Sequence, residues 1–250
     1  MRREKWLVRE PAQDSAALLF CIPYSGCGAS MYRQWPRFMD HVEICPVQLP
    51  GRENRMREPA YGTYEDMAEG LADGLLRHLD RPFGFFGHCG SALAAVETTR
   101  CLAGRGAPLP SRLFLSSQVA PHDPPYGRLL GMNEAQLRDE LHHLLLGMGT
   151  APPPDLVDLA LEILVTDMEA TRKYRFDTPF ELPTSITAIG WTQDIDVPAD
   201  LITGWSAYAP TDFELLEGVH YAFLEAPEAL RRVLLRGLEP AAVHCGERTR

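Results

Sequence analysis

The stretch FFGHCGSALAAVE, residues 85–97, has the pattern of a strand followed by a tight turn and a helix. A short apolar run ends at Gly87, a single cysteine follows at position 89, and small residues then lead into a helical pattern. Small neighbours are required where a helix starts directly after a strand and packs closely against it. The stretch therefore predicts an α/β fold in which Cys89 is presented at the turn.

The same alternation continues along the chain. Expected strands cover residues 17–22, 42–49, 83–86, 112–116, 185–189 and 213–216, and expected helices cover 63–79, 91–102, 198–205 and 227–235. Thr63 and Asp66 are placed as a capping box at the start of the first of these helices. Strands that alternate with helices predict a mainly parallel, twisted sheet with helices on both faces.

One segment interrupts the alternation with two helical patterns, residues 133–146 and 155–174, and no strand. An all-helical insertion between strands of an α/β sheet often covers the strand ends where such folds bind ligands. We therefore expect a lid insertion at about residues 123–180. The alternative is that these helices only cover one face of the sheet.

Composition favours a single domain over residues 1–250, because no linker, repeat or low-complexity tract divides the chain. A net charge of −10 argues against a nucleic-acid partner, which would require a basic face. The first 15 residues lack the apolar core of a secretion signal, and no run reaches the roughly 20 apolar residues of a membrane helix. These features predict a cytoplasmic protein without a membrane partner.

The cysteines lie scattered, without C-x-x-C spacing, so that neither a metal site nor a disulfide framework is expected. The turn at Cys89 instead fits the pattern G-x-S-x-G, in which hydrolases hold their nucleophile, although Ser91 replaces the last glycine. A second small-residue loop, PYSGCGAS at 23–30, can turn backbone N–H groups toward an oxyanion, and the expected donors are Ser25 and Gly90. An ordinary glycine-rich turn and a phosphate-binding loop are the alternatives, and the lysine of the latter is missing.

The expected base is His220, which follows a predicted strand near the end of the chain. His88, beside the cysteine, is expected to be structural. The loop after the strand at 185–189 offers Asp194, and Asp196 as second choice, to orient the imidazole. The loop after the strand at 112–116 has no carboxylate before residue 123. The predicted catalytic set is thus Cys89, His220 and one of these two aspartates.

With these residues in view, the chain resembles the type II thioesterases, stand-alone α/β-hydrolases that accompany polyketide synthases and nonribosomal peptide synthetases. The resemblance spans residues 17–235 and is carried by VQLPGRENRMREP (47–59), PYSGCGASMYRQW (23–35), DMEATRKYRF (167–176) and GVHYAFL (218–224). In that family the acid precedes a D-x-x-V step, which matches Asp194 and Val197. Two residues depart from the family, because Cys89 replaces serine and Ser91 replaces glycine.

The resemblance implies an α/β-hydrolase fold, a monomer, no cofactor of its own, and acyl or peptidyl thioesters on the phosphopantetheine arm of a carrier protein as substrates. A catalytic serine would convert such a thioester into an oxoester, whereas Cys89 would form a second thioester almost without change in free energy. Three hypotheses follow: a thioesterase with an acyl-cysteine intermediate, an acyl or aminoacyl transferase or a lactone- or lactam-forming cyclase, and a non-catalytic carrier-protein binder. The retained loop and histidine favour an enzyme.

An acidic carrier protein would need a local basic patch to dock on this acidic chain. The candidates are Arg52 and Arg55 in the loop after the second strand and Arg231, Arg232 and Arg236 on the last helix. The C-terminal HCGERTR is expected to be a frayed tail with an incidental thiol at Cys245.

Overall fold

The computed structural model describes residues 6–149 and 153–239, so the predicted tail and Cys245 lie outside the described residues. A seven-stranded sheet with the order β2-β3-β1-β4-β5-β6-β7 forms its centre, and all neighbouring strands are parallel except the pair β2 and β3. The strands are β1 Ala17–Cys21, β2 Phe38–Met39, β3 Val42–Pro46, β4 Phe83–His88, β5 Arg112–Ser116, β6 Ser185–Trp191 and β7 Thr211–Leu216. The fold is the predicted α/β-hydrolase arrangement.

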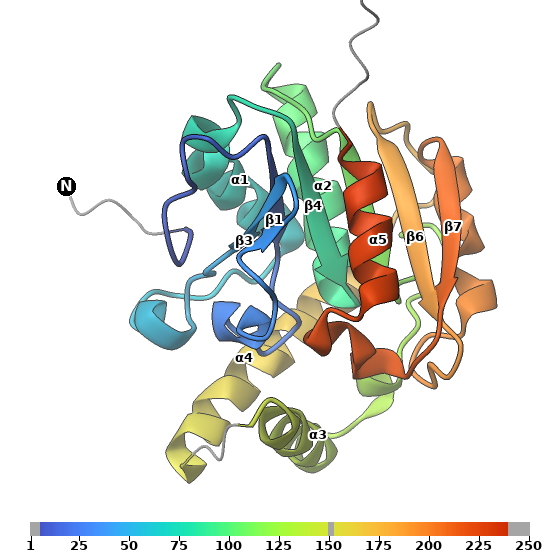
Figure 1. Ribbon diagram of the computed structural model, residues 1–250. Helices are drawn as coiled ribbons and strands as arrows, with labels where there is room; N and C mark the ends of the chain where they lie inside the picture. The colour runs from blue at the N-terminus through green and yellow to red at the C-terminus, as the bar shows by residue number, and fades with distance from the viewer. Residues whose placement is uncertain (1–5, 150–152, 240–250) are drawn as a thin grey trace, which may run out of the picture.

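Helices cover both faces of this sheet (Figure 1). They are α1 Tyr64–Leu75, α2 Gly90–Gly104, α3 Glu134–Gly147, α4 Pro154–Lys173 and α5 Glu228–Gly237. Buried apolar residues of α1 and α2 belong to one core cluster, and those of α5 belong to a second cluster with the opposite side chains of the strands. All six residues of the central strand β4 are buried, because a strand covered on both faces has no side that meets water.

The differences from the expected elements have local causes. The edge strand β2 has only two residues, which is too short for a periodic pattern. Residues Ala199–Ala207 form a 3-10 helix, and the Thr, Gly and Ser residues within this segment are weak formers of a regular α-helix. Strand β4 continues to His88, because its pairing with β5 extends to Ser116.

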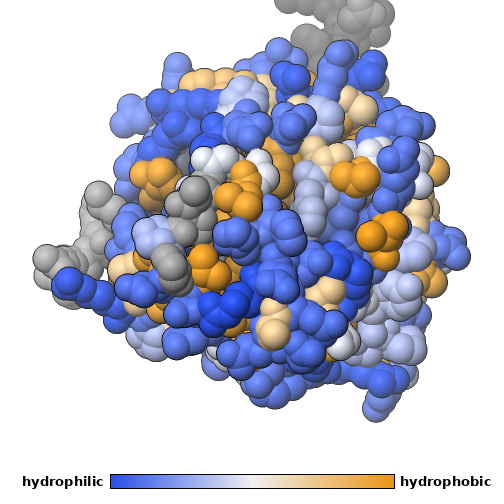
Figure 2. Space-filling view, turned by 90° about the horizontal axis from the view of Figure 1, so that it is seen from below, coloured by the Kyte–Doolittle hydropathy of each residue, from blue (hydrophilic) through white to orange (hydrophobic). Residues whose placement is uncertain are grey.

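The two helices of the insertion, α3 and α4, pack against each other beyond the carboxyl ends of the strands (Figure 1). Residues of α4 also contact α2, the helix that follows the cysteine turn. The view onto this end of the molecule shows a largely hydrophilic surface with separate hydrophobic patches (Figure 2). Among the described helices, none combines the length and the apolar character needed to span a membrane.

Candidate active site

The turn between β4 and α2 holds Cys89 in a strained backbone conformation, with φ of 55°. The Ser91 hydroxyl closes this turn: it accepts a hydrogen bond from the His88 amide at 2.8 Å and donates to the His88 carbonyl at 3.0 Å. A Cβ on Gly87 would collide with the backbone of Ser91, so this position requires glycine. The serine that departs from the expected pattern therefore stabilises the turn that presents the cysteine.

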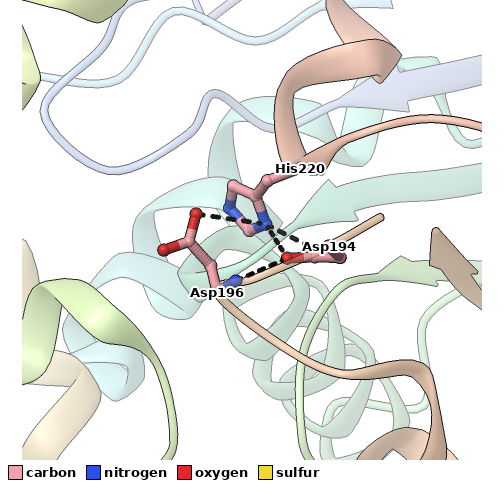
Figure 3. A group of neighbouring side chains, drawn as sticks. All are labelled: Asp194, Asp196 and His220. Atoms are coloured by element: carbon pink, nitrogen blue, oxygen red, sulfur yellow. Dashed lines mark hydrogen bonds and ion pairs between the residues drawn. The ribbon is translucent and has the colours of Figure 1, made fainter. Parts of the chain in front are cut away.

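The structure brings His220 and Asp194 together (Figure 3). The imidazole Nδ1 lies 2.9 and 3.1 Å from the two carboxylate oxygens. The same carboxylate accepts the hydroxyl of Ser117 at 2.6 Å and the amides of Asp196 and Val197 at 2.8 and 2.9 Å. Burial disfavours the charged carboxylate, but these hydrogen bonds and the charge of His220 lower the pKa of Asp194 well below its usual value. Asp194 is thus held as an anion that orients the imidazole.

Asp196, the second choice for this position, is engaged elsewhere. Its carboxylate lies 3.9 Å from Nδ1 of His220, beyond hydrogen-bond distance, and 2.5 Å from Nε of Arg128. The two terminal nitrogens of Arg128 lie 2.7 and 2.8 Å from the carboxylate of Glu140 on α3. Asp196 therefore connects the site to the helical insertion instead of to the imidazole.

Cys89 and His220 line the same small cavity. Burial disfavours the imidazolium, but the contacts with Asp194 and Cys89 raise the pKa of His220 to about 9. Ligand atoms of Asp194, Asp196 and His220 lie within 4.8 Å of one another, a spacing that suits a metal ion. Each of the three already has a partner in the hydrogen bonds and ion pairs above, so the cluster fits an acid–base relay better than a cation site.

His88 has a position that its sequence context did not reveal. Its Nε2 lies 3.3 Å from Nε2 of His220, and its Nδ1 lies 2.9 Å from the hydroxyl of Ser116. The ring stacks on Phe223 with 4.0 Å between ring centroids and is completely buried. Burial and the nearby His220 lower the pKa of His88 well below its usual value. A neutral second imidazole therefore contacts the candidate base.

The two expected oxyanion donors are adjacent. A Cβ on Gly90 would lie 2.8 Å from the hydroxyl oxygen of Ser25 and 2.7 Å from that of Tyr64. As the first residue of α2, Gly90 has an N–H without an acceptor within the helix. The next amide of the first loop, that of Gly26, donates to Asp167 of α4 at 2.8 Å. The side chain of Ser25 thus lies against the first residue of α2, and the role of the two amides as oxyanion donors stays a prediction.

Residues of the insertion line the small cavity at the cysteine. Residues 126–130 and the side chains of Met168 and Thr171 on α4 line the remaining cavity together with Cys89 and His220, and its volume is about 10 Å³. Two larger cavities lie nearby. One of about 360 Å³ lies between α4 and the loops around residues 26–30 and 51–56, and one of about 570 Å³ lies between α3 and the loop that carries His220.

The prediction of a docking patch is wrong for Arg52 and Arg55, because both are buried. Arg52 forms an ion pair with Asp167 at 2.6 Å, and Arg55 pairs with Glu58 at 2.5 Å. Their charges are used inside the protein and do not contribute to a surface for an acidic partner.

The three arginines of α5 are exposed, as a docking patch would require. Two of them have acidic neighbours: Arg236 lies 2.8 Å from Glu214, and Arg232 lies 4.0 Å from Glu228. The positive charge of this surface is therefore partly neutralised.

Comparisons with known proteins agree on one family. The model of the thioesterase domain matches residues 17–236. The gramicidin S biosynthesis protein GrsT of Aneurinibacillus migulanus is 31% identical over 236 residues, which cover 89% of each chain. The structure of RedJ, a thioesterase from the prodiginine pathway of Streptomyces coelicolor, is 32% identical with a TM-score of 0.74, over 92% of this chain and 94% of RedJ. The type II thioesterase BorB of the borrelidin cluster is 25% identical with a TM-score of 0.77, over 95% and 99% of the two chains.

Proposed function

The chain belongs to the thioesterase family, and on that premise we propose that it releases acyl or peptidyl groups from the phosphopantetheine arm of a carrier protein. Its relatives are thioesterases of polyketide and nonribosomal peptide pathways, so the protein is a thioester hydrolase of the type II kind. We assign the catalytic chemistry to Cys89, His220 and Asp194. One observation carries it: His220, whose Nδ1 is held by Asp194, lines the same small cavity as the cysteine of a strained strand-to-helix turn.

In the acylation step, Sγ of Cys89 attacks the thioester carbonyl while its proton passes to Nε2 of His220. Asp194 stabilises the imidazolium that forms, since it accepts the Nδ1 proton in a hydrogen bond throughout. The amides of Ser25 and Gly90 stabilise the oxyanion of the tetrahedral intermediate. The intermediate then collapses, and His220 returns the proton to the departing phosphopantetheine sulfur. The products are an acyl-cysteine thioester and a carrier protein with a free thiol.

In the deacylation step, His220 removes a proton from water, which attacks the acyl-cysteine and releases the free acid. An amine, an alcohol or a second thiol can attack in place of water. The cysteine favours this second candidate function, acyl transfer or ring closure, because an acyl thioester keeps the reactivity of the original substrate. Hydrolysis and transfer therefore share the first half of the reaction and differ in the acceptor.

We also propose that residues 123–180 act as a lid. The cavity at Cys89 has room for about one water molecule and none for an acyl chain, and residues 126–130 line it together with α4. Admission of a substrate requires that part of this cover moves.

The proposal is tested with carrier protein loaded with an acyl group, followed by intact-protein mass spectrometry. We expect an acyl adduct on Cys89, its absence in Cys89→Ala, and release of free acid over time. A matched variant, Cys101→Ala, removes another partly exposed thiol and should leave the adduct unchanged. Neither adduct nor turnover in the unaltered protein would support the non-catalytic binder instead.

The acceptor is identified in the same experiment with a second, unloaded carrier protein or an amine present. Faster discharge to these acceptors than to water would favour transfer, and unchanged release of free acid would favour hydrolysis. Cys89→Ser provides the comparison, because its oxoester intermediate is less reactive toward amines and thiols than a thioester.

A further inference from the structure

The hydrogen bonds around Ser116 determine where a neutral His88 carries its proton. Nε1 of Trp191 lies 3.0 Å from the Ser116 hydroxyl and can only donate to it. The same hydroxyl lies 2.9 Å from Nδ1 of His88 and is completely buried. Among the hydrogen bonds of the described residues, Nδ1 of His88 is the one acceptor within reach of the Ser116 proton. Ser116 therefore donates to Nδ1, which leaves the His88 proton on Nε2.

The proton on Nε2 of His88 faces His220, the proposed base. Nε2 of His88 lies 3.3 Å from Nε2 of His220, and the ring centroids are 4.4 Å apart. When His220 is neutral, its Nδ1–H points to Asp194 and its Nε2 lone pair accepts from His88, and this hydrogen bond breaks when Nε2 takes the Cys89 proton. When His220 is protonated, two N–H groups face each other across the same distance. The contact thus favours the neutral base over the imidazolium.

The other groups that face His220 act differently. Asp194 and Cys89 favour the imidazolium, and Asp196 at 3.9 Å is neutralised by Arg128. The rings of Tyr24 and Tyr221 lie 6.0 and 5.0 Å from the imidazole, and burial raises the pKa of both phenols, so they remain uncharged.

We propose that His88 is a positioning residue that opposes protonation of His220 through a hydrogen bond from its Nε2, with Ser116 and Trp191 fixing the tautomer that makes this bond. The inference rests on the proposed pairing of Cys89 with His220. Its consequence is that the thiolate–imidazolium pair forms at a higher pH than the Asp194–His220–Cys89 arrangement alone would give. The contact between His88 and His220 also fixes the plane of the His220 imidazole, whose Nδ1 is held by Asp194.

The test is the rate of Cys89 alkylation by iodoacetamide as a function of pH, followed by mass spectrometry of the modified peptide. His88→Phe keeps a ring on Phe223 but removes the donor, and we expect the half-maximal pH to fall by about half to one unit, the effect of one hydrogen bond. Ser116→Ala keeps the His88 ring and releases its tautomer, and we expect a smaller shift in the same direction. An unchanged or higher half-maximal pH in both variants would overturn the inference.

A matched control removes a buried hydroxyl on α2 without touching the imidazoles. Thr99→Val deletes a hydroxyl that donates to the carbonyl of Ala95 at 2.9 Å. Its alkylation profile should coincide with that of the unaltered protein. A shift equal to that of Ser116→Ala would mean that any buried hydroxyl has this effect, and the inference would be wrong.

The tautomer is measured directly in the unaltered protein, which avoids any variant that fails to fold. Long-range proton–nitrogen NMR spectra of ¹⁵N-histidine protein are recorded above the His220 pKa of about 9, where both rings are neutral. We expect the His88 proton on Nε2, and a proton on Nδ1 would contradict the inference. The proposed function has a separate readout: absence of both an acyl adduct on Cys89 and turnover refutes it, whereas an adduct with unchanged alkylation profiles refutes only the role of His88.

Discussion

Arg52 and Asp167 form a buried ion pair that fastens α4 to the loop after β3, with one guanidinium nitrogen 2.6 and 2.8 Å from the two carboxylate oxygens. Asp167 also accepts the amide of Gly26. Burial raises the pKa of Asp167, which the charge of Arg52 opposes. The C-terminal half of α4 is therefore held on the loop that supplies Ser25.

Asp167→Asn should strongly destabilise the fold, since it leaves a buried guanidinium without its counter-charge. The free energy of unfolding in urea should fall by about 3–5 kcal/mol, the range for breaking a buried pair. Glu169→Gln on the same helix removes an exposed partner of Lys173 and should leave the unfolding midpoint almost unchanged. Equal effects of the two substitutions would contradict the structural role of the Arg52–Asp167 pair.

Asp194→Asn should lower kcat for thioester hydrolysis by roughly three to four orders of magnitude, because an amide no longer stabilises the correct tautomer and the imidazolium. Asp196→Asn should have a much smaller effect, since its carboxylate lies outside hydrogen-bond distance of the imidazole. Steady-state kinetics with one acyl-loaded carrier protein compare the two variants. A larger loss in Asp196→Asn would reverse the assignment of the acid.

His220 should make stability depend on pH in a defined direction. Its pKa in the folded protein, about 9, lies above the ordinary value of 6.5, so the folded state binds the proton more tightly than the unfolded state. This contribution is fully present below about pH 6.5 and is lost as the pH rises through 9. Urea unfolding at several pH values should show that the stability of the unaltered protein relative to His220→Gln declines over this window. A difference that grows with pH would have the wrong sign.

Arg128→Ala should loosen the cover over Cys89, because this arginine links Asp196 to Glu140 on α3. Loss of charge-assisted hydrogen bonds should increase the rate of Cys89 modification by a bulky maleimide roughly tenfold relative to iodoacetamide. Arg138→Ala removes an exposed pair with Asp158 between the two insertion helices and serves as the control. If both variants behave alike, the Asp196–Arg128–Glu140 link does not hold the cover.

The sequence predicted those features that depend on short-range patterns. The turn at Cys89, strand β5 and the helix after the turn follow from local periodicity and small residues, and the positions of Ser25, Gly90 and His220 follow from the ends of predicted strands. The choice of Asp194 over Asp196 was open, because both stand in one loop. It depends on Ser117 and Arg128, which come from other segments of the chain.

Features that depend on distant partners were missed. The sequence alone suggested that Arg52 is a surface cation, because its partner Asp167 lies 115 positions away in the chain. His88 reads as a structural neighbour of the turn because its contact with His220 forms only when β4 extends far enough to pair with Ser116. The position of this histidine, directly before the proposed nucleophile, was the one available signal.

The small cavity above Cys89 has a consequence for how the enzyme would choose among acyl groups. A cavity of about 10 Å³ is not a preformed pocket whose shape could select one acyl chain over another. With α4 fastened through Asp167, opening of the cover would have to release the segment from Tyr126 to Leu130, which Arg128 links to Asp196 and Glu140. Selection among acyl groups would then be kinetic and would take place at entry. Acyl groups that open the cover slowly would reach the thiol of Cys89 less often than those that open it fast.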